Sequence, residues 1–599
     1  MTLSYVDIGN ANLPVYCLDT LVIGTGCAGY NAADWLHELG RHGSRPRDFA
    51  IITDRKNYGT SRNTGSDKQT YYKLSFGGDA PDSVPMMARD LFAGGGMHGD
   101  HALAMAAGSA RCFFKLANLG VPFPRNEYGE YVGYQTDHDS TARATSAGPL
   151  TSKYMTEALE KNVISKGIRI FDNMMAIRLL TRDNALRGLL ALDLTQLESK
   201  NFGLTLFCVN HVIMATGGPA GVYHRSVFPE SQAGMTGMAL EAGAAAENLS
   251  LWQYGLASTK FRWNVSGTYQ QVIPKYISVD QQGAEREFLA EHLDFVFLKG
   301  YQWPYDPSKA SSLVDRLVYR EIHELGRRVF MDFRSDPTGF DFGLLGDEAR
   351  NYLKRSGALL PTPIARLAKM NPQAIALFKN NGIDLYNEPL EIDVCAQHCN
   401  GGLAVDEHWQ CSLRGLYAAG EAAGTFGACR PGGSALNAAQ VGSMRAAEHI
   451  AKQPDITPCF DQAMAKDAEQ LISQIEASLG SKGESPARLQ LRSQKEFSAH
   501  CAHVRSAEQF NAMYCARKSG IASYFELCSI NSHSQIPGLL RTRDMLITQA
   551  AMLSAMQAQA GEGIIYTRFQ DGEFISEQRP VRPVPQRNTW FETVWGSDK

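Results

Sequence analysis

The chain has 599 residues, more than one hydrophobic core can accommodate, so we expect two to four domains. Hydrophobic residues make up 44% and charged residues 20%, which is typical of a globular protein rather than a disordered or fibrous one. The net charge of -4 argues against nucleic acid as the main partner, because phosphate binding requires an excess of Lys and Arg.

The patterns of apolar residues and cysteines indicate a cytoplasmic protein. No apolar run has the length of a membrane span, and the N-terminal segment lacks the basic and then apolar layout of a signal peptide. The 12 cysteines form no C-x-x-C pair, so we expect no iron–sulfur cluster, zinc site or other metal. We therefore expect a cytoplasmic enzyme that does not span a membrane.

The first recognisable motif lies near the N-terminus. An apolar run at residues 21–23 ends at Gly24, Gly26 and Gly29, in the pattern G-x-G-x-x-G. Residues 30–39 have helical periodicity, and residues 49–54 form a second apolar run where a parallel strand should follow. In such a strand–turn–helix unit the glycines let a pyrophosphate approach the backbone, and the helix N-terminus offers unpaired N–H groups. This context predicts a dinucleotide site rather than a glycine-rich loop without a ligand.

The alternation of strands and helices continues to about residue 250. Residues 58–66 are small and polar and are expected to form a loop against a flat ligand. Helices are predicted at residues 100–119, 150–166 and 234–243. Strands are predicted at residues 168–172, 185–193, 204–208 and 209–218, the last ending in a second glycine turn.

The pattern then changes twice. Between residue 251 and about residue 388 aromatic side chains become dense and the strand–glycine–helix alternation disappears, which indicates an inserted domain. The alternation resumes with a strand at 415–421 and a helix at 435–452, and residues 453–599 are expected to be mainly helical. The predicted divisions are residues 1–250 and 389–452 for the nucleotide-binding domain, 251–388 for the inserted domain and 453–599 for the C-terminal region.

Four separated segments resemble one known family. They read G-T-G-C-A-G at 24–29, A-T-G-G at 215–218, H-C-N-G-G-L-A-V at 398–405 and GLYAAGEAAGTFGACRPGGSALNAAQVGS at 415–443. Together they resemble the flavoprotein subunits of fumarate reductase and succinate dehydrogenase, with their relatives L-aspartate oxidase and adenylylsulfate reductase. The resemblance implies an α/β fold, with a Rossmann-like FAD-binding domain, an inserted α+β capping domain over the flavin ring and a helical C-terminal region.

The resemblance implies FAD as the cofactor. Membrane-bound members of the family attach FAD through a histidine in an R-S-H-T segment, where this chain has Asn63, so we expect non-covalent FAD. The helix beginning near Ser434 would direct its N–H groups and positive dipole end at the flavin pyrimidine edge, favouring the reduced anion by roughly 1 kcal/mol per contact. Alternatively, Ser434 merely caps that helix. Glu421 resembles the family acid that bonds the ribitol or ribose, or is an ordinary carboxylate at the end of a strand.

The residues expected to bind FAD are Gly24, Gly26, Cys27, Ala28, Gly29, Thr53, Asp54, Ser61, Asn63, Thr64, Gly65, Ser66, Ala176, Ala215, Thr216, Gly217, Thr236, Glu421, Arg430, Gly433, Ser434, Ala435 and Leu436.

The family holds a substrate carboxylate with a histidine and an arginine near the flavin. His398 and Arg430 match them by motif, and arginine suits this role because its planar fork of donors meets a carboxylate with two parallel hydrogen bonds. Both residues are candidate catalytic residues of this chain.

The capping segment departs from the family. The family reads W-Q-F-H-P-T where residues 252–257 read W-Q-Y-G-L-A, and a proton-donating arginine aligns with Gln271, which cannot shuttle a proton. Tyr254 and Gln271 are kept as candidate catalytic residues. The candidates for proton transfer are Tyr254, Tyr276, Lys275 and Arg262. The whole aromatic stretch could instead be the core of the capping domain.

The predicted function is that of an FAD-dependent oxidoreductase that transfers a hydride between flavin N5 and a small polar, carboxylate-bearing substrate. Fumarate and succinate themselves are disfavoured, because polar residues that the family uses for them are replaced. One alternative is oxidation of an alcohol or amine, as in L-aspartate oxidase. Another is a flavin subunit that works with a ferredoxin-like iron–sulfur partner, as in adenylylsulfate reductase. A non-catalytic flavin-binding scaffold is the third.

Overall fold

The computed structural model describes residues 1–8, 11–42, 47–77, 81–135, 141–559 and 563–585. Its central feature is a five-stranded parallel sheet around β3 (Thr20–Ile23), every residue of which is buried. The strand order is β20 (Leu416–Ala418), β11 (His211–Met214), β3, β4 (Phe49–Ile52) and β7 (Ile170–Phe171). Because all five strands are parallel, their carboxyl ends meet along one edge, which is where ligands bind in open α/β sheets.

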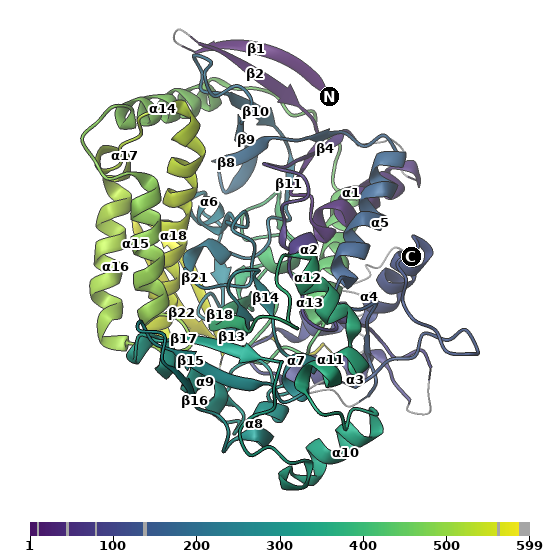
Figure 1. Ribbon diagram of the computed structural model, residues 1–599. Helices are drawn as coiled ribbons and strands as arrows, with labels where there is room; N and C mark the ends of the chain where they lie inside the picture. Colours follow the sequence, from purple (N-terminus) through teal and green to yellow (C-terminus); the bar gives the residue numbers. More distant parts are fainter. Residues whose placement is uncertain (9–10, 43–46, 78–80, 136–140, 560–562, 586–599) are drawn as a thin grey trace.

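Helices cover one face of this sheet. The glycine turn after β3 opens α1 (Cys27–His42), which packs against α5 (Thr151–Ser165) and α13 (Ser434–Lys452), while α13 also packs against α4 (Gly99–Asn118) (Figure 1). The predicted helices at 30–39, 100–119, 150–166 and 435–452 match these four within a few residues. The N-termini of α1 and α13 both lie at the ligand-binding edge, because each helix follows or faces a carboxyl strand end.

A second, mixed sheet packs beside the first. Its strand order is β1 (Thr2–Ile8), β2 (Ala11–Cys17), β10 (Leu204–Cys208), β9 (Ala185–Asp193) and β8 (Met174–Arg182). The bounds predicted for β9 and β10 agree with the structure, because each strand is an apolar run between turn residues. The predicted helix at 234–243 is α6 (Thr236–Glu241). Shorter elements are α2 (Thr60–Asn63), α3 (Val84–Ala93), β5 (Tyr71–Tyr72) and β6 (Ala144–Thr145).

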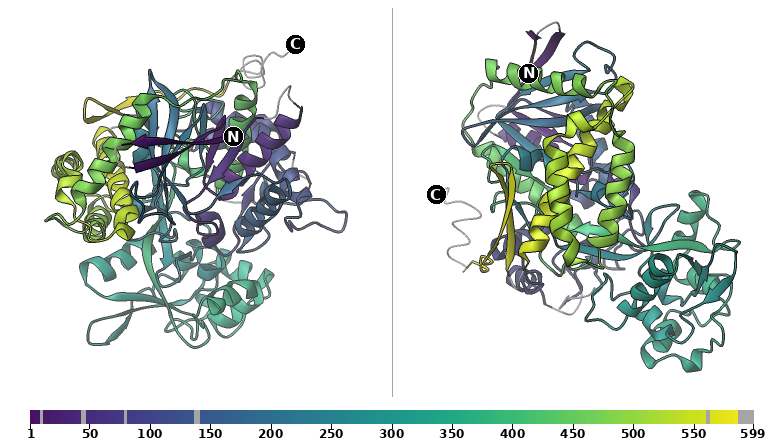
Figure 2. Two further views of the ribbon diagram at one scale, coloured as in Figure 1. Left: turned by 90° about the horizontal axis from the view of Figure 1, so that it is seen from above. Right: turned by 90° about the vertical axis from the view of Figure 1, so that its left-hand side faces the viewer.

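The inserted segment builds an antiparallel sheet of its own, which extends away from the rest of the molecule (Figure 2, right). Its order is β14 (Trp263–Asn264), β13 (Trp252–Ser258), β18 (Leu390–Cys399), β17 (Arg328–Asp332), β15 (Lys275–Val279) and β16 (Glu285–Glu287). Its helices are α7 (Thr268–Gln271), α8 (Leu293–Leu298), α9 (Ser312–Tyr319), α10 (Asp347–Arg355), α11 (Pro363–Met370) and α12 (Pro372–Asn380). The chain leaves the nucleotide-binding part along β13 and returns to it along β18. These two strands pair with each other, so both connections lie side by side in this sheet.

The C-terminal region is helical as predicted, but it also contains a hairpin. Helices α15 (Pro486–His500), α16 (Ala507–Ala522) and α18 (Ile536–Ala558) lie side by side (Figure 1), with α14 (Gln462–Ser478) and α17 (Tyr524–Leu527) at one end. The hairpin β21 (Ile564–Gln570) and β22 (Glu573–Arg579) extends a small sheet with β12 (Ala246–Glu247) and β19 (Gly402–Leu403). Across the described ranges, no helix is both long and apolar enough to cross a membrane.

Candidate functional site

A cavity opens at the carboxyl edge of the parallel sheet. Fifteen of the residues predicted to bind FAD line it: Gly24, Gly26, Cys27, Ala28, Thr53, Asp54, Ser61, Thr64, Ala176, Ala215, Thr216, Gly217, Glu421, Ala435 and Leu436. These residues come from the ends of β3, β4, β11 and β20, from the starts of α1 and α13, from α2 and the residue after it, and from β8. The fold therefore collects at one edge side chains that are far apart in the sequence.

The glycine turn cannot accommodate residues larger than glycine at Gly24 and Gly29. Gly24 has a φ of +110°, and a Cβ there would lie 2.4 Å from the carbonyl oxygen of Ala215. A Cβ on Gly29 would lie 2.0 Å from the carbonyl oxygen of Gly24, so the third glycine permits close packing of α1 and does not itself line the cavity. The hydroxyl of Thr216, which faces this turn, is buried without a hydrogen-bond partner among the described residues.

The N-terminus of α1 offers donors to an anion. The amide of Cys27 donates to the hydroxyl of Ser61 at 3.2 Å, so a polar oxygen already lies where the first free N–H groups of the helix point. Gln232 closes the opposite wall by donating to the carbonyl oxygens of Thr216 and Gly218 at 2.7 and 3.2 Å. The residues present therefore fit a dinucleotide with its pyrophosphate at this turn.

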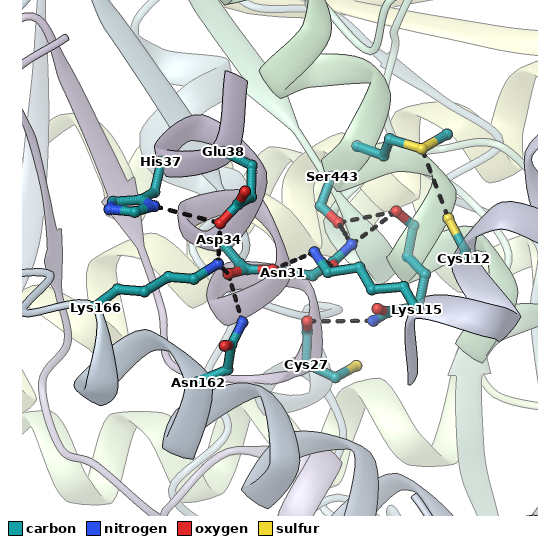
Figure 3. A network of polar contacts seen from close by, with 12 residues as sticks. Cys27, Asn31, Asp34, His37, Glu38, Cys112, Lys115, Asn162, Lys166 and Ser443 are labelled. Carbon is teal, nitrogen blue, oxygen red and sulfur yellow. Dashed lines mark hydrogen bonds and ion pairs between the residues drawn. The ribbon is translucent and has the colours of Figure 1, made fainter. Parts of the chain in front are cut away.

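A buried polar network ties α1 to α13 (Figure 3). Asn31 of α1 donates to the backbone oxygen of Gln440 at 3.0 Å and to the hydroxyl of Ser443 at 2.7 Å, and it accepts from Lys115 at 2.8 Å. Gln440 in turn donates to the backbone oxygen of Cys27 at 3.3 Å. These bonds hold the two helix N-termini at a set separation along the cavity.

The start of α13 forms part of the cavity wall. The residue before the helix is Gly433, with a φ of +87°, and no side chain caps the helix. The Ser434 hydroxyl donates to the backbone oxygen of Pro431 at 2.8 Å, so the alternative that Ser434 caps the helix is wrong. Ala435 and Leu436 therefore present an uncapped helix N-terminus to the cavity.

Glu421 is a buried acid in the cavity wall. Its Oε1 accepts the Cys399 amide at 2.8 Å. Burial raises the pKa of the Glu421 carboxyl to about 7, and the amides of Cys399 and Gly218 and the charge of Arg430 offset part of that increase. This carboxyl is therefore partly protonated near neutral pH.

Arg430 and His398 meet at the boundary between the capping sheet and the nucleotide-binding part. Arg430 is buried, and its Nε and Nη2 donate to Gln253 Oε1 at 2.9 and 2.7 Å, while Nη1 donates to the backbone oxygen of Pro431 at 3.3 Å. Gln253 lies opposite His398 across β13 and β18. No carboxylate in the described part of the chain forms an ion pair with Arg430 (N···O within 4.0 Å). Burial lowers the pKa of Arg430 to about 10, with Glu421 acting in the opposite direction.

The ring of His398 is oriented by Asn400. The Nδ2 group of Asn400 donates to the Gly427 oxygen at 2.7 Å, which directs Asn400 Oδ1 at His398 Nδ1, 3.0 Å away. Burial, and secondly the charge of Arg430, holds the pKa of His398 well below its usual range. The ring is thus neutral with its proton on Nδ1, which leaves Nε2 as an acceptor, and His398 is one of the residues that line the cavity.

Comparisons with known proteins agree with this arrangement. The model of the family described as FAD binding domain matches residues 19–436. The chain is 26% identical over 444 residues to one of the subunits of fumarate reductase (CoM/CoB) from Methanothermobacter marburgensis, covering 73% of each protein. It is 26% identical over 446 residues to L-aspartate oxidase of Agrobacterium fabrum, covering 73% of this chain and 74% of that protein.

This chain belongs to the FAD binding domain family.

It is an FAD-dependent oxidoreductase, as the resemblance implies, and FAD is its cofactor. The FrdA chain of E. coli quinol fumarate reductase has the same fold, with a TM-score of 0.71 at 18% identity over 96% of this chain and 98% of that one. Adenylylsulfate reductase of Archaeoglobus fulgidus has a TM-score of 0.67 at 14% identity over 98% of this chain and 99% of that one. The predicted fold class is confirmed. The predicted exclusion of fumarate finds no support, because a fumarate reductase is among the relatives.

Several residues predicted to bind FAD lie outside the cavity lining of this oxidoreductase. Asn63 donates its side-chain amide to the backbone oxygens of Asn57 and Gly59 at 2.8 and 3.0 Å, and Gly65 packs against Trp263. The others that do not line the cavity are Gly29, Ser66, Thr236, Arg430, Gly433 and Ser434. Residues 58–66 also depart from a simple loop, because Thr60–Asn63 form one helical turn.

The remaining catalytic candidates have hydrogen-bond or ion-pair partners other than His398 and Arg430. The hydroxyl of Tyr254 shares a hydrogen bond of 2.8 Å with that of Tyr223, and Gln271 Oε1 accepts from Tyr352 at 2.9 Å within the cap. Of the alternatives for proton transfer, Tyr276 donates to Gln270, Lys275 lies 3.7 Å from Glu287, and Arg262 pairs with Glu230. The structure thus brings His398 and Arg430 together, and within the described ranges none of the other candidates forms a hydrogen bond or ion pair with either.

Other residues of the site were not among the candidates that the sequence analysis named. Gln253 and Asn400 orient Arg430 and His398, and Gln397 lines the cavity beside them. Trp303 fills the space left by Gly255, since a Cβ there would lie 2.5 Å from Trp303 Nε1. Gln253 and Asn400 could have been found as polar neighbours within the matched motifs, whereas Trp303 could not, because its contact arises only from folding of the cap.

Proposed function

We propose that this FAD-dependent oxidoreductase transfers a hydride between its flavin and a carbon of a small carboxylate-bearing substrate. Arg430 and His398 hold the substrate at the boundary between residues 251–388, which form a cap, and residues 1–250 and 389–452, which bind FAD. Residues 453–599 form a separate, mainly helical C-terminal region. When bound, FAD supplies hydride transfer at N5.

The observation that supports this proposal best is the environment of Arg430. A buried guanidinium requires hydrogen bonds and, as a rule, an anion. Its partners are an amide oxygen and a backbone oxygen, both neutral. The positive charge therefore remains available for a ligand, and the fork of N–H donors suits a carboxylate.

His398 complements Arg430 as a proton acceptor. Since Asn400 holds its proton on Nδ1, Nε2 can take a proton from the substrate or from solvent. A substrate carboxylate beside the ring would raise the low pKa of His398 by its charge, so ligand binding and protonation of His398 favour each other. The proposal gives neither Tyr254 nor Gln271 a role in proton transfer, because the Tyr254 hydroxyl is hydrogen-bonded to Tyr223 and Gln271 accepts from Tyr352.

The experiment that tests the function is rapid mixing of the full-length holoenzyme with a substrate panel. Photoreduced enzyme is mixed with enoates, fumarate included, and oxidised enzyme with hydroxy and amino acids, while flavin absorbance is recorded. We expect at least one carboxylate to change the flavin redox state and its methyl ester to fail. If esters react as fast as the free acids, the assigned role of Arg430 is wrong.

Oxidation of an amino acid is the second candidate function, favoured by the match to L-aspartate oxidases. In that reaction the C–H hydride goes to the flavin and the amine loses a proton, for which the unprotonated Nε2 of His398 is suited. Fast reduction of the oxidised enzyme by an amino acid, with reoxidation by oxygen, would support this candidate over enoate reduction.

Three further expectations belong to the proposal. FAD is held non-covalently, an electron partner of the ferredoxin class exchanges electrons with the flavin, and the protein is cytoplasmic. The location rests on cysteine usage, since all 12 cysteines are free thiols. Co-purification of a small iron–sulfur protein with the full chain would support the partner.

A further inference from the structure

The C-terminal helix α18 places a positively charged side chain in the wall of the cofactor cavity. Arg541 is on the second turn of this helix and lines the cavity together with Asp54, which follows β4. Arg541 Nη2 donates to Asp54 Oδ2 at 2.8 Å, although 487 residues separate the two in sequence. Both side chains are about one-third exposed, so the pair lies at the cavity rim.

The position of Asp54 identifies the end of the cavity at which this pair lies. Asp54 follows Thr53 just beyond β4, the strand next to β3, where an acid accepts hydrogen bonds from the ribose of the adenosine half of a dinucleotide. Ala435 and Leu436, at the start of α13, line the same cavity. Arg541 therefore lies at the adenosine end of the cavity.

The helix is held firmly enough to define where the guanidinium lies. One turn further along α18, the buried Asp544 accepts the Met238 amide at 2.7 Å, and Arg543 pairs with Glu241, so α18 is fastened to α6. The residues just before α6, from Ser231 to Met235, also line the cavity. α18 and the cavity wall are thus parts of one packed unit.

The other arginine in the lining has a different partner. The guanidinium of Arg55 lies 4.7 Å from the centre of the Tyr58 ring, over its face. Arg541 uses Nη2 for one oxygen of Asp54, which leaves Asp54 Oδ1 free of hydrogen bonds to the described residues. An ion pair so exposed contributes little to folding by itself, so its place in the cavity needs another explanation.

We propose that Arg541 is a cofactor-binding residue that positions Asp54 for the adenosine ribose of FAD. The C-terminal region thereby takes part in holding the cofactor. The inference concerns FAD and not the substrate, so it stands or falls independently of the roles of Arg430 and His398.

The test is a double-mutant cycle on FAD affinity in the full-length protein. Flavin is removed, and the dissociation constant of added FAD is measured by quenching of flavin fluorescence for wild type, Arg541→Ala, Asp54→Ala and the double variant. We expect each single substitution to weaken FAD at least tenfold and the double variant to be little weaker than either, because the two residues act as a unit.

The matched control is Arg492→Ala, which breaks another exposed ion pair of the C-terminal helices, with Glu484 at 2.6 Å. It should leave FAD affinity within twofold, and the melting temperatures of flavin-free Arg541→Ala and wild type should agree. FAD affinity of Arg541→Ala within twofold of wild type would overturn the proposal, as would additive effects in the double variant.

Discussion

Gln253 Oε1 accepts hydrogen bonds from both Nε and Nη2 of Arg430, at 2.9 and 2.7 Å, where the capping sheet meets the segment before α13. The Nε2 group of Gln253 is buried and has no partner among the described residues. A neutral side chain thus orients the guanidinium without neutralising it. This relationship joins the cap to the cofactor domain through the group assigned to substrate binding.

Replacement of Gln253 tests this relationship. In Gln253→Glu a carboxylate takes the place of the amide oxygen and neutralises Arg430, so the dissociation constant of a carboxylate substrate should rise at least tenfold, about 1.4 kcal/mol. Gln253→Ala removes the orienting oxygen but leaves the charge, so it should weaken binding less. Equal affinities for the two variants in a flavin-absorbance titration would contradict the role of an unneutralised Arg430.

The glycine turn should tolerate no side chain at Gly29. Because a Cβ there would lie 2.0 Å from the Gly24 oxygen, Gly29→Ala must shift α1 or the turn. We expect loss of bound FAD and a decrease of about 1–3 kcal/mol in the free energy of unfolding. Gly520→Ala on α16, where a Cβ meets nothing within 4 Å, is the control and should keep the flavin. A yellow Gly29→Ala protein of normal stability would refute the tight packing.

Asp544 should make stability depend on pH. Burial raises the pKa of its carboxyl to about 7, so the native state binds more protons than the unfolded chain between about pH 4 and pH 7. Stability is therefore lost as the pH rises through that interval. Asp544→Asn removes this dependence, and its free energy of unfolding relative to wild type should increase by on the order of 4 kcal/mol from pH 4 to pH 7. Denaturant unfolding at several pH values measures this difference. If the free energies of unfolding of wild type and Asp544→Asn depend on pH in the same way, the pKa of the Asp544 carboxyl is not raised.

The flavin should be released by acid. Asn63, which stands where a covalently bound family member has histidine, directs its side chain at the backbone of residues 57 and 59. Precipitation of the holoenzyme with trichloroacetic acid should leave the yellow colour in the supernatant. A yellow pellet after washing would mean that another side chain forms a covalent bond to FAD.

Much of the fold and of the cofactor site follows from local sequence patterns. The turn around Gly24 and Gly26 and the helices α1 and α13 are specified by residues adjacent in the chain, and periodicity and glycine spacing are sufficient to predict them. His398 and Arg430 are predicted because the segments that contain them, at 398–405 and 415–443, match motifs of the family. These features depend on contacts over short stretches of chain.

The parts that escaped prediction depend on contacts between distant segments. Arg541 meets Asp54 only when α18 packs against α6, and β21 finds its partner β12 more than 300 residues earlier. Tyr254 lies in β13, where the pairing register with β18 shifts between Gln253 and Tyr254. Simple alternation along the strand therefore does not predict which face of the sheet each side chain occupies. Periodicity alone does not carry such information.

The most direct test of the account is a titration of the oxidised holoenzyme with small mono- and dicarboxylates, observed through the flavin absorbance. We expect saturable spectral shifts with wild type and a dissociation constant at least a hundredfold higher with Arg430→Met, while Arg445→Lys, a buried arginine on α13 that bonds the Glu407 backbone oxygen, binds like wild type. Equal carboxylate affinity in wild type and Arg430→Met would contradict the central claim that Arg430 binds the substrate carboxylate.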